Sequence, residues 1–241
     1  MWFWRNGLNI AYDLHIHSSL SPCADNDMTP NNIVNMSILK GLDVIAITDH
    51  NSCANVQAIA SCAKNTSLLV IPAMEIETAE EIHVVCLFPN TEMATEMQKL
   101  VYSRLPNIRN KEDIFGEQLI LDENDELIGK EDRLLLTSTA ITINEVFQVV
   151  NQKLGGLAIP AHIDRQSNSI LSNLGAMPED IDIKCVEISD IKAELSKDNK
   201  ISTMKRIYSS DAHYLWNIHE REYFIDVKSL TIESVFKALR I

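Results

Sequence analysis

Short apolar runs rich in β-branched residues recur along this 241-residue chain, and every histidine except His219 lies at or near the end of one of them. The runs alternate with stretches of helical periodicity, which predicts a largely parallel sheet with helices on its outside. Barrels of this kind gather their functional side chains at the carboxyl ends of the strands, which meet at one edge. We therefore expect the histidines to cluster at one mouth of a parallel β-barrel.

The apolar runs predict strands at 10–17, 43–48, 68–76, 83–88, 157–160, 185–188 and 207–209. Helix signals include Thr29-Pro30, which caps and opens a helix to about residue 40, and a capping box at 142–145. The number of strands favours a closed or nearly closed barrel, and we expect residues 1–241 to form a single domain. Residues 104–141 are rich in charge and predict a hairpin-like excursion within that domain.

The charge of the chain bears on its partners. A formal net charge of −13 and a pI near 4.9 describe a surface that repels long polyanions, so extended nucleic acid is not expected as a partner. A small phosphorylated substrate in a local basic pocket is compatible with this charge. The chain has no apolar run long enough to span a membrane, and residues 1–7 lack a signal pattern. We therefore expect a cytoplasmic protein with reduced cysteines and make no prediction of its oligomeric state.

Histidines at three strand ends are candidate metal ligands. His15 and His17 stand two residues apart on a strand, so both project from one face and can bind one ion or two adjacent ions. His50 and His162 each end another apolar run. Both have a simpler alternative, since His50 would be a bystander beside a helix-capping Asp49, and His162 would be a core histidine with its hydrogen bonds satisfied.

Glu75 and His83 are expected to meet across a hairpin. If residues 74–77 pair with 82–85 around a turn centred near Ala79, Glu75 lies directly opposite His83. Facing residues of such a pair have β-carbons about 4.5–5.5 Å apart, which is close enough to share an ion. The alternative is that Glu75 is one of several acids in this turn.

Asp211 and His213 again stand two residues apart after a strand. A turn-capping role would explain Asp211 but not His213, whereas a carboxylate–imidazole metal pair explains both. Imidazole with carboxylate suits zinc, iron(II) or manganese. The candidate ligands exceed what one ion needs, so we expect two or three divalent transition-metal ions. In chain order the candidates are His15, His17, His50, Glu75, His83, His162, Asp211 and His213.

The order of these ligands resembles the PHP (polymerase and histidinol phosphatase) family along the whole chain. The resemblance implies an α/β, TIM-like fold, a distorted seven-stranded (β/α) barrel, with a trinuclear metal centre. It also implies phosphoester hydrolysis, because members act as histidinol-phosphate phosphatases, as nucleotide phosphodiesterases or phosphatases, and as exonucleases. Other members are proofreading modules of bacterial DNA polymerases.

Two further residues take their expected roles from this resemblance. The family usually has an Asp or His five or six residues after the second histidine of the first motif, where this chain has Pro22 and Cys23. Cys23 could bind an ion as a thiolate, Asp25 could reach in instead, or Cys23 is a small buried thiol. Arg165 resembles an arginine that holds the substrate phosphate in nucleotide-cleaving members, since a guanidinium fork suits a phosphate dianion. The alternative for Arg165 is an ordinary surface arginine.

We therefore expect a metal-dependent phosphoesterase that hydrolyses a small phosphorylated compound, a nucleotide or another phosphomonoester or diester, by a metal-activated hydroxide. Asp211, His213 and Arg165 are the expected catalytic residues, and Arg165 contacts the phosphate. The enzymatic alternative is a TIM-barrel amidohydrolase, which also begins with His-x-His but would end with a lone Asp. The other alternative is a non-catalytic metal-binding regulatory module, which would be expected to have lost ligands.

Overall fold

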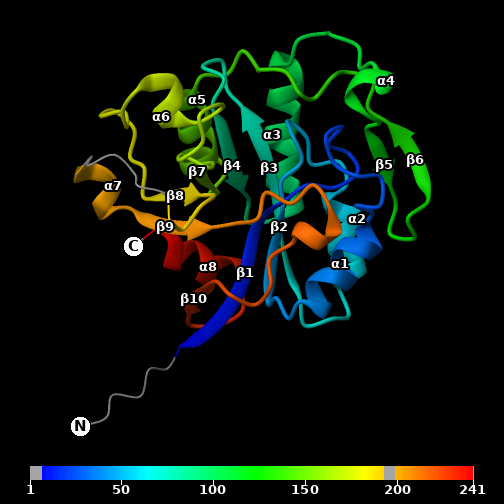
Figure 1. The fold of residues 1–241 in the computed structure, drawn as a ribbon, viewed down its shortest axis with the longest axis horizontal. Helices are drawn as coiled ribbons and strands as arrows, with labels where there is room; N and C mark the ends of the chain where they lie inside the picture. The colour runs from blue at the N-terminus through cyan, green and yellow to red at the C-terminus, as the bar shows by residue number, and fades with distance from the viewer. Residues whose placement is uncertain (1–6, 193–198, 241) are drawn as a thin grey trace.

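A curled sheet of six strands organises the computed structural model, which describes residues 7–192 and 199–240. Within these residues the strands follow the order β10–β1–β2–β3–β4–β7. β1, β2 and β3 are parallel, whereas β10 is antiparallel to β1, and β4 is antiparallel to both β3 and β7. Figure 1 shows β1 to β4 in the middle of the molecule. Their bounds are β1 (Leu8–Ile16), β2 (Val44–Ile47), β3 (Leu69–Glu77), β4 (His83–Leu87), β7 (Leu157–Pro160) and β10 (Phe224–Val227).

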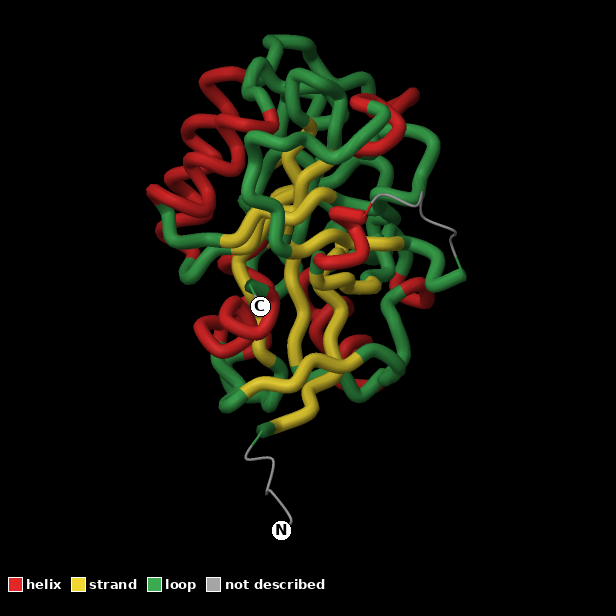
Figure 2. Tube along the Cα trace, turned by 90° about the vertical axis from the view of Figure 1, so that its left-hand side faces the viewer, coloured by secondary structure: helices red, strands yellow, loops and turns green. Residues whose placement is uncertain are grey.

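Helices lie outside the strands, as the alternation in the sequence predicts (Figure 2). The predicted cap of the first helix is confirmed, because the Thr29 side chain accepts a hydrogen bond from the backbone N–H of Asn32. The side chain of Thr142 caps its helix in the same way, and that helix continues directly into a π-helix, η1. The helices are α1 (Pro30–Leu39), α2 (Val56–Ala63), α3 (Thr91–Arg104), α5 (Ile143–Phe147), η1 (Gln148–Lys153), α6 (Ile170–Leu174), α7 (Asn199–Thr203), the 3₁₀ turn η2 (Leu215–Asn217) and α8 (Ile232–Leu239).

The apolar core covers both faces of the curled sheet. Tyr12 and Leu14 of β1 belong to a cluster that also contains Phe236 of α8. Ile45 of β2 belongs to a second cluster, which packs under α1, α2 and α3 and includes Met97. Because both faces are covered, the polar residues of the strands are concentrated at the strand ends.

A single closed barrel of seven strands is not confirmed. β8 (Cys185–Ile188) and β9 (Lys205–Tyr208) pair in parallel as a separate two-stranded sheet. β8 packs beside β7, but no ladder of backbone hydrogen bonds joins them within the described residues. The segment after β9 returns to β1, where the N–H of His17 donates to the carbonyl of Ala212 at 2.9 Å. The α/β fold is therefore a curled half-barrel with β8 and β9 alongside it.

The predicted hairpin between β3 and β4 is present, but the expected register is wrong by two residues. His83 pairs with Glu77, and Glu75 pairs with Val85. The turn is longer than expected, since Glu81 adopts a left-handed conformation with φ of +59°. Glu75 and His83 therefore lie diagonally on one face rather than directly opposite each other, still within reach of long side chains.

The predicted excursion forms a hairpin of β5 (Leu119–Leu121) and β6 (Leu127–Lys130), preceded by the short helix α4 (Glu112–Phe115). Figure 1 shows it at the side of the molecule, near α1 and α2. The N–H of Leu119 donates to the carbonyl of Ser19 at 2.9 Å. The carboxylate of Asp125 accepts hydrogen bonds from the Thr29 hydroxyl and the Asn31 N–H at 2.9 and 3.0 Å. The excursion is thus packed against the loop after β1 and the start of α1.

Within the described residues, every helix is too short or too polar to span a lipid bilayer. Residues 1–6, which carry most of the argument against a signal pattern, lie outside the described part of the chain.

Candidate metal centre

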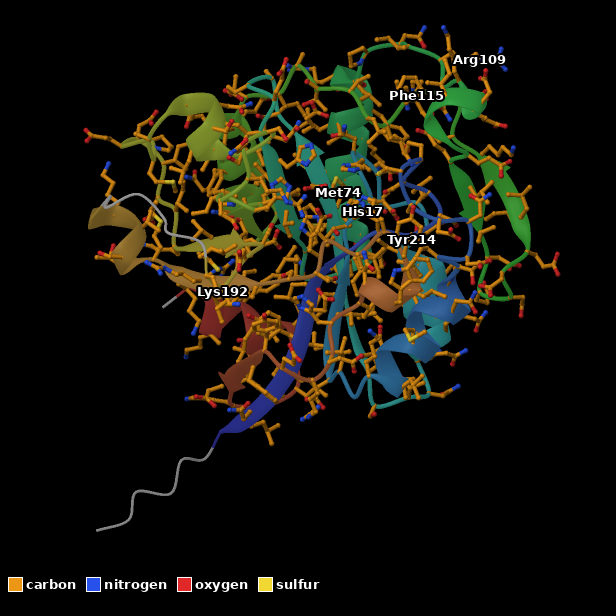
Figure 3. The ribbon with its side chains drawn as sticks, in the orientation of Figure 1. His17, Met74, Arg109, Phe115, Lys192 and Tyr214 are labelled. Carbon is orange, nitrogen blue, oxygen red and sulfur yellow. The ribbon has the colours of Figure 1, made fainter. Side chains whose placement is uncertain are left out.

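The eight predicted ligands gather at one end of the curled sheet, where Figure 3 labels His17 in the middle of the view. They come from separate strands because the polar residues follow the apolar runs that the core requires. His15 ends β1 with His17 just beyond it, His50 follows β2, Glu75 lies near the end of β3, His83 begins β4, His162 follows β7, and Asp211 and His213 follow β9.

The carboxylate of Glu75 is the centre of this cluster. Its side chain is 1% exposed, and neither carboxylate oxygen forms a hydrogen bond with any described residue. Five imidazoles nevertheless surround it among the described residues. The nitrogen–oxygen distances to Glu75 are 3.0 Å from His50 and His83, 3.3 Å from His162, 3.4 Å from His15 and 3.5 Å from His17.

A second convergence involves His15, His17 and Asp211. The Nε2 atoms of the two histidines face each other at 3.1 Å. Asp211 Oδ1 lies 3.1 Å from Nε2 of His17 and 3.3 Å from Nε2 of His15. Ring nitrogens and carboxylate oxygens that point at one another in a buried place are the donor set that a divalent cation satisfies.

The ligand atoms fall into three groups, each close enough to hold one ion. Within the described residues these groups are His17, His50 and His213; then His15, His17, Glu75 and Asp211; and finally His50, Glu75 and His83. His162 and Cys23 lie outside the three groups. The residues present therefore fit a metal centre, and a carboxylate shared between two groups suits a centre with more than one ion.

Burial and neighbouring charges set the protonation of the ligands. Burial alone would raise the pKa of Glu75, but the nearby rings of His83 and His15 hold it well below its usual value. Burial, reinforced by the neighbouring His213 ring, holds the pKa of His17 well below its usual value. Glu75 and His17 therefore shift toward the forms that bind metal, an ionised carboxylate and a neutral imidazole. The pKa values of His15, His50 and His83 are raised instead, because neighbouring negative charges outweigh the effect of burial.

A buried acid near the start of the chain orients His17. Asp49 accepts hydrogen bonds from the hydroxyls of Ser18 and Ser21 at 2.6 and 2.7 Å. Ser21 Oγ in turn lies 2.9 Å from Nδ1 of His17. Because the Ser21 hydroxyl donates to Asp49, its lone pairs face the ring, so Nδ1 of His17 carries the hydrogen. The other nitrogen, Nε2, is then left with a free lone pair that points into the centre.

Glu187 performs the same function for His15, and the sequence prediction missed it. Its carboxylate lies 2.9 Å from Nδ1 of His15 and accepts a hydrogen bond from the backbone N–H of His162 at 3.2 Å. The other nitrogen of His15 therefore faces the centre. The available signal was an acid inside the buried strand Cys185–Ile188, because such a side chain requires a polar partner. The partner is 172 positions away along the chain, so no local pattern names it.

Two of the ligands have strained backbones. His162 and Asp211 adopt φ angles of +29° and +50°, a region that residues other than glycine rarely occupy. Conformations of this kind concentrate at functional sites, where the surrounding structure holds them in place.

Arg165 lies at the mouth of the cluster. Its side chain is 43% exposed, and Nη1 forms a 2.6 Å contact with Oδ2 of Asp211. It lines a cavity of about 120 Å³ together with ligands of the centre and two polar neighbours, Ser167 and Asn168. The structure therefore places Arg165 beside the predicted ligands, with one face of the guanidinium toward solvent.

Cys23 is an exposed residue whose thiol lies within hydrogen-bonding reach of His50 and His213. Partial burial of the sulfur would raise the pKa of this thiol, but the two imidazoles lower it to about 6. Asp25 is positioned differently, since its Oδ1 accepts a hydrogen bond from the N–H of Asp27 at 2.8 Å. Between Cys23 and Asp25, the structure places the Cys23 thiol nearer to the histidines of the cluster, and which of them binds metal stays a prediction.

Known proteins share parts of this chain and its fold. A 5′-3′ exoribonuclease of Haemophilus influenzae is 34% identical over 79 residues, which are 32% of this chain and 28% of the exoribonuclease. The lesion-specific endonuclease EndoQ of Pyrococcus furiosus aligns with a TM-score of 0.69 and 19% identity, covering 97% of this chain and 56% of that chain. Endonuclease Q in complex with a 27-mer duplex substrate that carries an abasic lesion gives a TM-score of 0.69 and 18% identity, with 97% and 57% covered. The chain thus spans about half the length of endonuclease Q and less than a third of the exoribonuclease.

The expectation that extended nucleic acid is not a partner is wrong. The same fold in endonuclease Q is seen with a DNA duplex, whose abasic lesion lies at the active site. The inference failed because the net charge of −13 sums the whole chain, including carboxylates that face the interior of the cluster. Bound cations change the local charge that a phosphate meets, so the total charge does not decide whether a strand binds there.

The family model described as the PHP domain matches residues 13–160. This range is more than half of the 241-residue chain and contains the ligands from His15 to His83. His162, Asp211 and His213 lie beyond the matched range, and the fold brings them to the same cluster. The chain therefore belongs to the PHP domain family, as the order of its ligands predicts.

Proposed function

We propose that this chain is a metal-dependent phosphoesterase whose substrate is a nucleotide or a nucleic-acid strand. The observation that carries the proposal is the buried carboxylate of Glu75, which lies within 3.5 Å of five imidazoles and accepts no hydrogen bond from any described residue. A buried carboxylate without hydrogen bonds is costly, and cations shared with the imidazoles would offset that cost.

The donor set suits two or three ions of zinc, iron(II) or manganese, because imidazole and carboxylate are their common ligands. When bound, such ions polarise a phosphoryl oxygen and make a hydroxide available at neutral pH. The inner ions would be held by His15, His17, Glu75 and Asp211, and the set would be completed by His50, His83, His162, His213 and Cys23.

The residues around the ligands would keep them ready to bind. Glu187 would hold the ring hydrogen of His15 on Nδ1, and the Ser21–Asp49 pair would do the same for His17. The Nε2 atoms of both rings would then stay available to bind metal. Arg165 would contact the substrate phosphate at the mouth of the centre, exchanging its present contact with Asp211 for a phosphate oxygen.

Two comparisons support a substrate that contains a nucleotide. The exoribonuclease shares 34% identity over 79 residues, and endonuclease Q shares the fold and holds a DNA duplex in one complex. A mononucleotide would present a phosphomonoester to the metal centre, whereas a dinucleotide or a strand would present a phosphodiester.

The proposal is tested by loading the purified protein with manganese, iron(II) or zinc and assaying four substrate classes. These are 4-nitrophenyl phosphate, bis(4-nitrophenyl) phosphate, single-stranded oligonucleotides and a panel of amides. We expect metal-dependent hydrolysis of a phosphoester and none of the amides. Hydrolysis confined to the amides would favour an amidohydrolase, and no metal binding at all would reject the proposal.

A further inference from the structure

Two exposed aromatic rings follow Asp211 and His213, the candidate metal ligands after β9. The rings of Tyr214 and Trp216 stack on each other with centroids 4.7 Å apart and an interplanar angle of 20°. Tyr214 is 38% exposed and Trp216 is 69% exposed, which is unusual for side chains of this size. The pair therefore presents a flat apolar surface to solvent in a chain whose aromatic content is only 6%.

The backbone of the loop that carries the rings is held by hydrogen bonds from Lys40 and by apolar packing. Lys40, at the end of α1, donates hydrogen bonds from its largely buried Nζ to the carbonyls of Trp216 and Ile218. Ile218 is buried, and Leu215 packs against the main apolar cluster. Because the backbone is anchored on both sides of Trp216, the rings are held outward and their exposure is a feature of the fold.

The rings also lie next to the metal centre. Tyr214 directly follows His213, whose ring stacks on the ring of His17 with centroids 4.3 Å apart. The carbonyl of His213 accepts a hydrogen bond from the N–H of Asp25, which ties this loop to the loop that carries Cys23. The two rings therefore stand on the loop that leaves the centre, within three residues of His213.

We propose that Tyr214 and Trp216 form a stacking platform for a nucleobase next to the scissile phosphate, an inference that rests on the proposed function. Stacking on an aromatic ring requires no positive charge on the protein. Every base has a π-face, so the platform would accept bases of any sequence in RNA or DNA.

The first test measures binding of a single-stranded phosphorothioate hexanucleotide, which resists cleavage, to the metal-loaded protein. Trp216→Ala and Tyr214→Ala should each weaken binding by about 5- to 100-fold, the usual range for loss of one base–aromatic contact. Trp216→Phe and Tyr214→Phe should restore most of the affinity. Phe224→Ala is the matched control, since Phe224 is 46% exposed but pairs with the opposite end of β1 from the ligands.

A second test removes the base instead of the ring. For the wild-type protein, an abasic nucleotide next to the scissile linkage should weaken binding about as much as Trp216→Ala does. Combining the abasic strand with Trp216→Ala should add little, because both changes remove the same contact. Full additivity would mean that the base lies elsewhere and would overturn the platform.

The outcomes separate this inference from the proposed function. Phosphoester hydrolysis with unchanged affinity in both alanine variants would reject the platform and leave the phosphoesterase intact. Base-dependent binding without hydrolysis would reject the phosphoesterase and leave the platform. If instead the wild-type protein dimerises in sedimentation and Trp216→Ala makes it a monomer, the rings form an interface between copies, and the platform is rejected.

Discussion

Hydrogen-bonding partners place the ring hydrogens of two histidines in the centre, one partner 172 residues away in the sequence and the other four residues away. Glu187 orients His15, and Ser21 with Asp49 orients His17, so that two inner nitrogens point at the same place. The three groups of ligands share residues, and loss of one side chain therefore affects more than one group. Substitutions at this scale should act on metal content first and on folding second.

Removing a candidate ligand should abolish activity without unfolding the protein. Asp211→Ala and His15→Ala each delete a metal ligand and little core volume, so we expect no detectable phosphoesterase activity and reduced metal content. Elemental analysis and circular dichroism check the two parts. Asp182→Ala, at an exposed acid paired with Lys184, is the control and should keep full activity. An active Asp211→Ala protein at matched metal content would contradict the assignment.

Arg165→Ala should reduce kcat/KM by about 10- to 200-fold, the kinetic equivalent of losing a charged hydrogen bond of about 1.5–3 kcal/mol. Metal content should not change, because Arg165 contacts Asp211 only from the solvent side. Arg104→Ala is the control, since Arg104 is also exposed and its nearest acid, Glu145, is 3.9 Å away. Equal kinetics for the two variants would assign Arg165 to the surface.

The metal stoichiometry of two further variants decides the role of Cys23. Cys23→Ser should lower the occupancy of one ion and leave the others bound, since the thiol faces His50 and His213. Asp25→Ala should leave the metal content unchanged, because its carboxylate is engaged by the N–H of Asp27. The reverse result would make Asp25 the ligand, and full occupancy in both would exclude either residue.

At the scale of helices and strands, local signals predicted the elements well and long-range pairing poorly. The Thr29-Pro30 start of α1 could be read because a cap acts within one helical turn. The register of β3 and β4 was predicted wrongly because the turn between them contains Glu81 in a left-handed conformation, which the neighbouring residues do not predict. The helix α3 was not predicted, although Asn90 caps it and its buried residues Ala94, Met97 and Val101 have regular helical spacing.

One glycine shows how the excursion shapes the site. A β-carbon at Gly116, where φ is +99°, would lie 2.1 Å from the carbonyl oxygen of Pro22. Gly116→Ala should therefore destabilise the fold and disturb the adjoining Cys23 loop. Gly175 is the matched control, because its φ is +78° and nothing lies within 4 Å of the added carbon.

Gly175→Ala should lose the free energy that a left-handed alanine costs, about 1 kcal/mol. Gly116→Ala also meets a backbone cost, because φ of +99° with ψ of 171° is a conformation essentially restricted to glycine. Gly116→Ala should lose at least about 1 kcal/mol more in urea unfolding, since the clash is with backbone and cannot be relieved by a side chain. It should also bind less metal than Gly175→Ala. Equal free energies of unfolding for the two variants would show that the excursion moves away from the added β-carbon at little cost.

At the scale of the whole molecule, the candidate site could be predicted more completely than the architecture. The polar residues near strand ends in the sequence do gather in the structure, because the fold brings those ends together, and their role as metal ligands stays a prediction. Whether the sheet closes could not be predicted, because pairing between β7 and β8 leaves no local pattern in the sequence. Within the described residues, these two strands form no ladder of backbone hydrogen bonds. That residues 1–241 form one domain stays a prediction.

Because no ladder of backbone hydrogen bonds joins β7 and β8 within the described residues, bound metal ions would have a mechanical role. His162 follows β7 and Asp211 follows β9, so ions bound in the centre would join two sheets that share no ladder in the described residues. Without ions, the β8–β9 pair should open more often by local unfolding. Amide hydrogen exchange in β8 and β9 should then accelerate by about tenfold or more when a chelator is added, which corresponds to a loss of at least about 1.4 kcal/mol. Exchange in β2, which is paired on both sides, should stay slow. The metal centre would then stabilise one part of the fold, and loss of the ions would be detected only there.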